Sequence, residues 1–60
     1  MSLENHIIRN LASGQASARS LADTLSAELD HVTAILQRLV KERQLTTFKV
    51  ADIITVYKLA

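Results

Sequence analysis

The 60-residue sequence has no cysteine and no proline, a single glycine, and only two aromatic residues, Phe48 and Tyr57. Without cysteine, neither a disulfide nor a thiolate metal site can stabilise this short chain. The lack of cysteine also fits a reducing cytoplasm, where we expect the protein to be. With so few aromatics, the core must be built from Leu, Ile, Val and Ala, which are abundant in an apolar fraction of 48%.

The sequence also lacks a strong charge of either sign and a long apolar run. Seven basic residues against six acidic ones give a net charge of +1, which is too close to neutral to indicate a polyanionic partner. No apolar run approaches the ~20 residues that a membrane span requires, and the N-terminus lacks the pattern of a signal peptide. We therefore expect a soluble, unexported protein without membrane contact.

The chain length limits the size of the core. A chain of 60 residues buries only about 60% of the surface that its unfolded form exposes. We predict one small domain over residues 1–60, and self-association could add to its stability.

A first helix is predicted from about Leu3 to Ser13. Ser2 is a suitable N-cap, and Gly14 suits the position after the helix end, where positive φ is common. One face of this helix collects apolar residues at helical spacing: Leu3, Ile7, Ile8, Leu11 and Ala12. The next pair, Gln15 and Ala16, could add a short strand to a sheet formed later in the chain.

Two further helices follow with a tight turn between them. Ser17 is a good N-cap for a helix over residues 18–25, and Ser26-Ala27 form the turn. Glu28 and Asp30 lie at the start of the third helix and Lys41 and Arg43 in its last turn, where their charges complement the helix dipole. The apolar stripe of the third helix consists of Val32, Ile35, Leu36, Leu39 and Val40.

The C-terminal residues favour a β-hairpin. Residues 46–50 and 53–59 are rich in β-branched and aromatic residues, and Ala51-Asp52 separate the two runs. If the second strand alternates, the adjacent Ile53 and Ile54 cannot both face one core. One of them then forms an interface, or a twist or bulge in the hairpin buries both.

With its helix-turn-helix and hairpin, the chain resembles the winged helix-turn-helix family over essentially its whole length. The resemblance rests on the pattern LADTL, a gap, VTAILQRLVKERQL, and the final strand VYKL. It is similar to small bacterial regulators of fimbrial operons, and its spacing is also like that of Z-DNA-binding domains. The Z-DNA family has an Asn and a Tyr one turn apart on the third helix, where this chain has Thr33 and Gln37, so only the fold is carried over. The resemblance implies an α+β winged helix that binds double-stranded DNA and regulates transcription.

The same resemblance implies a set of DNA-binding residues. The third helix would enter the major groove, where Gln37 can pair with adenine, Arg38 with guanine or phosphate, and Lys41 with phosphate. The outward face opposite the apolar stripe also carries Asp30 and Ala34, with His31 and Thr33 on its flanks. The expected DNA-binding residues are Ser17, Arg19, Thr33, Gln37, Arg38, Lys41 and Lys49.

Nothing in the sequence indicates a metal site, a cofactor or catalysis. His6 and His31 lie on different predicted helices and have no second histidine or cysteine at ligand spacing. No strand-to-helix elbow or glycine-rich loop marks a nucleophile or a phosphate site. A domain of this size has little room for a substrate cleft. We expect neither an enzyme nor a small-molecule substrate.

Two expectations about partners follow. The near-neutral charge leaves open the alternative of a winged-helix protein-interaction module that does not bind DNA. We also predict a homodimer, because the core is small and a symmetric protein suits the two-fold symmetry of many operators. Its contacts would come from Leu3, Ile7, or one of Ile53 and Ile54.

Overall fold

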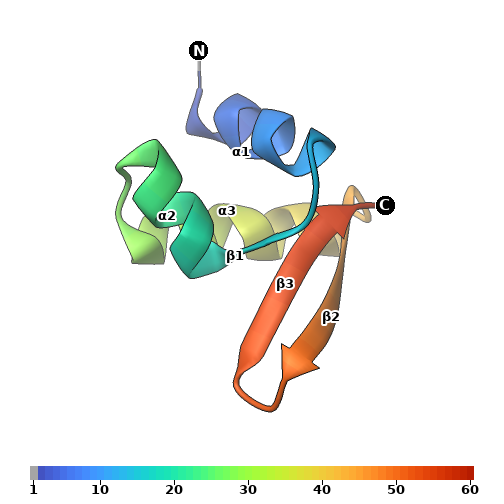
Figure 1. Cartoon of the computed structure of the whole chain (residues 1–60). Coiled ribbons are helices and arrows are strands. Elements are labelled where there is room, and N and C mark those ends of the chain that lie inside the picture. The colour runs from blue at the N-terminus through green and yellow to red at the C-terminus, as the bar shows by residue number, and fades with distance from the viewer. Residues whose placement is uncertain (1) are drawn as a thin grey trace.

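The computed structural model describes residues 2–60 and contains helices followed by a hairpin. The three helices gather at one end of the molecule, and the hairpin projects away from them (Figure 1). This arrangement confirms the predicted α+β architecture. The elements are α1 Leu3–Ala12, β1 Ala16–Ser17, α2 Ala18–Leu25, α3 Leu29–Lys41, β2 Leu45–Ala51 and β3 Ile54–Leu59.

The start of α1 and the residue that follows its end match the capping signals predicted from the sequence. The hydroxyl of Ser2 accepts a hydrogen bond from the amide of Asn5 at 3.3 Å, which caps the helix start. Gly14 follows the helix end with a φ of +150°, a conformation that glycine adopts at little cost. The short strand forms one residue later than expected, over Ala16–Ser17 instead of Gln15–Ala16.

A residue of positive φ follows each helix of the helix-turn-helix: Ser26 at +53° directly after α2, and Arg43 at +65° just beyond the C-cap of α3. After α3, the amide of Gln44 donates to the carbonyl of Leu39 at 2.9 Å, which is the Schellman pattern of a helix end. Arg43 therefore lies outside α3, and its predicted place in the last helical turn is wrong. Its left-handed backbone turns the chain directly into β2.

The sheet has the strand order β1-β3-β2, and both pairings are antiparallel. Ala16 lies opposite Tyr57, so β1 ties the start of α2 to the middle of β3. The register of β2 and β3 shifts between Lys49 and Ala51, which marks a bulge near the end of the hairpin. Because of this shift the turn consists of Asp52 and Ile53, one residue beyond the predicted Ala51-Asp52.

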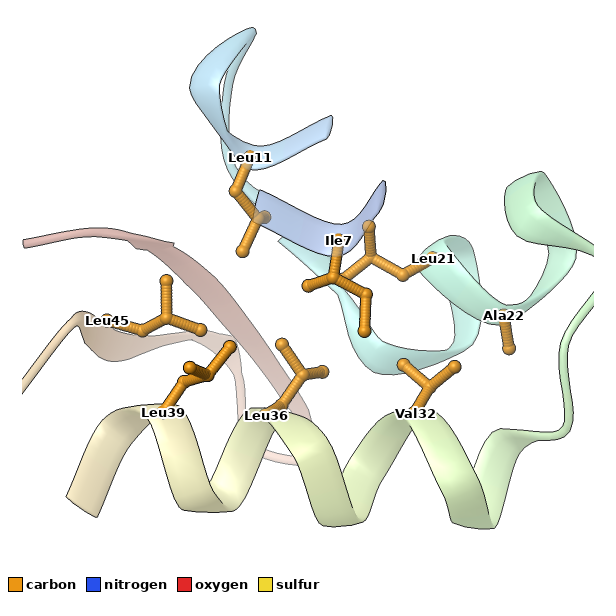
Figure 2. Close-up of a cluster of buried hydrophobic side chains, with 8 residues drawn as sticks. All are labelled: Ile7, Leu11, Leu21, Ala22, Val32, Leu36, Leu39 and Leu45. Atoms are coloured by element: carbon orange, nitrogen blue, oxygen red, sulfur yellow. The ribbon is translucent and has the colours of Figure 1, made fainter. Parts of the chain in front are cut away.

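The core lies between the three helices and the base of the hairpin (Figure 2). Leu36 is completely buried at its centre, which confirms the predicted phase of α3. In the hairpin only Leu45 of β2 belongs to the core cluster, while Val56 in the middle of β3 is buried outside it. The buried cluster comprises Ile7, Leu11, Leu21, Ala22, Val32, Leu36, Leu39 and Leu45.

Three isoleucines differ from expectation in their exposure. Ile53 is 93% exposed and Ile54 44% exposed, so the hairpin has a bulge but does not bury both side chains. They are exposed because the outer half of the hairpin extends past the helices (Figure 1). Ile7, by contrast, is fully buried, so it cannot contact a second copy as expected.

None of the helices within residues 2–60 is long and apolar enough to cross a membrane.

Candidate nucleic-acid interface

The outward face of α3 is set by the residues that the helix buries. Val32, Leu36 and Leu39 point into the core with no exposed area. Since successive residues in an α-helix are turned by about 100°, the side chains on the opposite face are those of Asp30, Ala34, Gln37 and Lys41. All four are exposed. The helix thus presents a line of exposed side chains away from the core, all of them polar except Ala34.

Beside this face lies an open groove, with a volume of about 920 Å³, between α2, α3 and the hairpin. It brings Ser17 and Arg19, at the start of α2, together with Thr33 of α3. Arg19 and Asp23 are its only charged side chains, and hydroxyl groups supply most of its other polar atoms. The groove is lined by Ser17, Ala18, Arg19, Ser20, Asp23, Thr24, Leu29, Thr33, Ile53, Ile54, Thr55 and Tyr57.

Ser17 explains why the start of α2 lies next to the hairpin. Its backbone belongs to β1 and lies opposite Val56 of β3, while its hydroxyl accepts a hydrogen bond from the amide of Ser20 at 3.2 Å. One residue therefore ends the strand pairing and begins the helix. This double role places Arg19 and Ser20, in the first turn of α2, on the wall of the groove.

Comparison with known proteins supports this geometry at the level of the fold. No protein-family model and no curated protein matches the chain by sequence. Among solved structures, the adhesin competence repressor (AdcR) of Streptococcus pyogenes superposes with a TM-score of 0.93 at 26% identity, over 100% of this chain and 46% of that one. The chain has the winged helix-turn-helix fold. A mutant of ZitR from Lactococcus lactis superposes with the same TM-score of 0.93 at 18% identity, over 100% of this chain and 42% of that one.

The winged helix thus spans less than half the length of either of these neighbours. In it, α2 and α3 form the helix-turn-helix, and β2, β3 and their turn form the wing (Figure 1). The groove described above lies where these parts meet.

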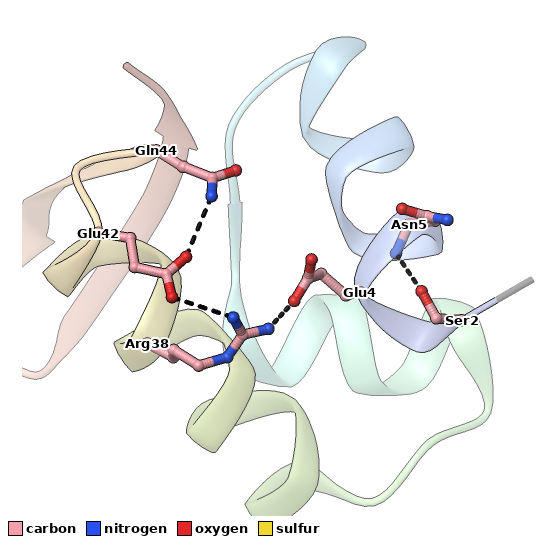
Figure 3. A network of polar contacts seen from close by, with 6 residues as sticks. All are labelled: Ser2, Glu4, Asn5, Arg38, Glu42 and Gln44. Carbon is pink, nitrogen blue, oxygen red and sulfur yellow. Dashed lines mark hydrogen bonds and ion pairs between the residues drawn. The ribbon is translucent and has the colours of Figure 1, made fainter.

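Arg38 lies on the other flank of α3, away from the groove. Its guanidinium forms an ion pair with the carboxylate of Glu4 on α1 (Figure 3). It also contacts Glu42 at 3.1 Å, and Glu42 in turn accepts from the side-chain amide of Gln44. Because Arg38 is one residue beyond Gln37, the helix turns it about 100° from Gln37 towards α1. The structure therefore does not bring Arg38 together with the other predicted site residues.

Lys49 lies on the wing, directly opposite Thr55 in the strand register. Thr55 lines the groove, so the exposed Lys49 is on the neighbouring strand at the groove's outer end. Gln37 and Lys41 lie farther along α3 and do not line the groove, but both are exposed on the outward face. The predicted residues other than Arg38 are thus distributed over the start of α2, the exposed side of α3 and the wing.

The net charge of this region is close to zero. Three predicted cations, Arg19, Lys41 and Lys49, lie on the same elements as three exposed carboxylates. These carboxylates belong to Asp23 on α2, Asp30 on α3 and Asp52 in the wing turn. Electrostatic attraction to a polyanion would therefore be weak, and specific polar contacts would have to supply much of any binding.

The two histidines do not join this region. His6 is half-buried on α1, and His31 is exposed on the flank of α3 near Arg38. Within the part of the chain that the structure describes, no three His, Cys, Asp or Glu side chains come close enough to hold a metal ion.

The sequence predicted Ser17, Arg19 and Thr33 as site residues but not the other polar side chains that line the groove, which are Ser20, Asp23, Thr24, Thr55 and Tyr57. Ser20 directly follows Arg19 in the first turn of α2, so its place beside the helix start was a usable signal. Tyr57 lies opposite Ala16 in the pairing of β1 with β3, which places it beside the start of α2. The sequence predicted a short strand at Gln15–Ala16 but not its partner strand or its register.

Proposed function

We propose that this winged helix binds double-stranded DNA and acts as a transcriptional regulator, with α3 as the helix that enters the major groove. The observation that carries the proposal is the outward face of α3. Its side chains are exposed, and within residues 2–60 the side chains of Gln37 and Lys41 make no hydrogen bond or ion pair that would hold them elsewhere. The fold, shared with a repressor, adds support.

The proposed contacts follow from the chemistry of each side chain. Gln37 can donate to and accept from adenine, and Thr33 can contact a base edge or a methyl group. Lys41 lies in the last turn of α3, where an ammonium group suits a phosphate. The hydroxyl and guanidinium groups at the start of α2, Ser17 and Arg19, and Lys49 on the wing are placed for phosphate contacts. Arg38 we assign to holding α1 against α3.

The test is direct binding to duplex DNA. We expect the protein to shift both random-sequence and genomic duplexes in an electrophoretic assay at low salt, with weaker binding as salt rises. With few cations on the face, the salt dependence should be shallow. If no duplex is shifted at low salt while circular dichroism shows folded protein, the DNA-binding proposal fails.

A second candidate function is a protein-interaction module, and the apolar wing favours it. Within residues 2–60, five large hydrophobic residues are exposed, and all except Leu29 lie in the wing: Phe48, Val50, Ile53 and Ile54. Exposed apolar side chains that gather on one projecting element are typical of interaction sites. If DNA binding fails, this surface becomes the functional one.

We also propose that the protein is a homodimer that uses the end of the wing. A symmetric contact between two copies would cover Ile53 and Ile54 on both subunits. The outward face of α3 belongs to a different element, so it could bind DNA at the same time.

A further inference from the structure

Asp30 is the feature of the outward face that DNA binding by itself leaves unexplained. Its carboxylate is exposed in the first turn of α3, on the same line as Ala34 and Gln37. Within residues 2–60 it has no hydrogen bond or ion pair. A carboxylate in a first turn is stabilised by the helix dipole, but the dipole does not require that it face outward.

The direction of Asp30 matters if α3 enters the major groove as proposed above. In helix-turn-helix proteins the N-terminal residues of this helix contact the base edges. A carboxylate placed there is repelled by phosphates and loses water, so it lowers affinity unless a donor replaces that water. The major-groove edges carry only two kinds of donor, the N4 amine of cytosine and the N6 amine of adenine.

We propose that Asp30 is a specificity-determining residue that accepts a hydrogen bond from an exocyclic base amine, with cytosine preferred; this inference rests on the proposed DNA-binding function. Adenine presents the N7 acceptor beside its N6 amine, and N7 repels the second carboxylate oxygen. Cytosine has no acceptor of its own on the major-groove edge. A carboxylate therefore suits cytosine, whereas an amide at the same place suits adenine.

The spacing along α3 relates this contact to that of Gln37. The two residues are seven positions apart, which corresponds to roughly 10 Å along the helix at about 1.5 Å per residue. Base pairs are stacked about 3.4 Å apart, so the two contacted bases are at most about three steps from each other. The expected site thus contains a cytosine and an adenine within about four consecutive base pairs.

The experiment is a selection from a randomised duplex library with the parent chain, Asp30→Ala and Asp30→Asn. Glu28→Gln is the matched control, because it removes one negative charge from the same end of α3 without facing outward in line with Gln37. Circular dichroism verifies that each variant is folded, which we expect because Asp30 is exposed.

For the parent we expect a required cytosine, and its replacement by thymine should weaken binding about 5- to 150-fold. Asp30→Ala should lose the preference at that position, and Asp30→Asn should shift it to adenine. Glu28→Gln should select the parental site. If Asp30→Ala binds all sequences more tightly and selects the same site as the parent, Asp30 only repels DNA and does not contact a base. The inference is then wrong. A parent that binds no duplex overturns the DNA-binding function itself and this inference with it.

Discussion

Arg38 on α3 and Glu4 on α1 form an ion pair that joins two helices far apart in the sequence (Figure 3). Both side chains are partly exposed, so the pair contributes about 0–1 kcal/mol to stability. The pair also holds the guanidinium on the flank of α3 that faces α1. The two cations in the second half of α3, Arg38 and Lys41, therefore have different surroundings and should behave differently towards DNA.

Lys41→Ala and Arg38→Ala form a matched pair, since each removes one positive charge from α3. If Lys41 contacts a phosphate, Lys41→Ala should lower the slope of log K against log salt by about one. Arg38→Ala should leave this slope nearly unchanged, because Arg38 is directed towards α1. Fluorescence anisotropy of a labelled duplex over a range of salt concentrations measures the slope for both variants. Equal slopes for the two variants would contradict the proposed division of roles.

Gln37→Ala should change which sequences are bound rather than how binding depends on salt. Removing the side-chain amide removes the contact with adenine, and a good bidentate pair is worth about 1–3 kcal/mol of discrimination. Competition between a preferred duplex and one with the adenine replaced measures this loss. If the variant discriminates as well as the parent, the helix phase that we assign to base contact is wrong.

Leu36→Ala tests the core. Leu36 of α3 is completely buried in the core between the helices. Truncating its side chain to alanine should therefore lower the free energy of unfolding by about 2–5 kcal/mol. With a total stability of about 5–15 kcal/mol for ordinary domains, this change could unfold a protein of this size. Ala34→Ser, on the exposed face of the same helix, is the control and should cost about 0.5 kcal/mol or less. Denaturant melts measure the free energy of unfolding of each variant. A loss below about half a kcal/mol for Leu36→Ala would place Leu36 outside the core.

Ile53→Lys tests the dimer. Because Ile53 is 93% exposed, the change should not disturb the core, but it would place two charges in one apolar contact of a symmetric dimer. We expect sedimentation to show a dimer for the parent and a folded monomer for the variant. Thr46→Lys adds the same charge at the base of the wing and should remain dimeric. A parent that is monomeric at high micromolar concentration would rule out the dimer.

Ser17→Ala tests the residue that links strand and helix. Loss of the hydroxyl that accepts from the Ser20 amide should cost about 0.5–2 kcal/mol. Ser2→Ala, at the corresponding position of α1, should cost less because Ser2 is exposed whereas Ser17 is half-buried. Thermal melts of both variants against the parent show whether the cap on α2 is the stronger one.

Local patterns in the sequence placed the helices and the strands to within about two residues. The start of α2 at Ala18 follows from the cap at Ser17, and the phase of α3 follows from the apolar stripe around Leu36. These features can be read from the sequence because helical spacing and helix caps involve residues within a few positions of one another. The order of elements was then enough to suggest the winged helix, and the structure confirms it.

Other features depended on residues distant in sequence, and only the tertiary structure decided them. Arg38 was placed on the outward face from its helix position, but Glu4 of α1 holds it on the other flank. The turn at the tip of the wing lies one residue beyond its predicted position because the pairing of β2 and β3 contains a bulge. Ile53 and Ile54 are both exposed because the wing extends beyond the helices, a matter of how whole elements pack. Helical periodicity is set within one segment, whereas ion pairs, strand register and exposure arise only when separate segments meet.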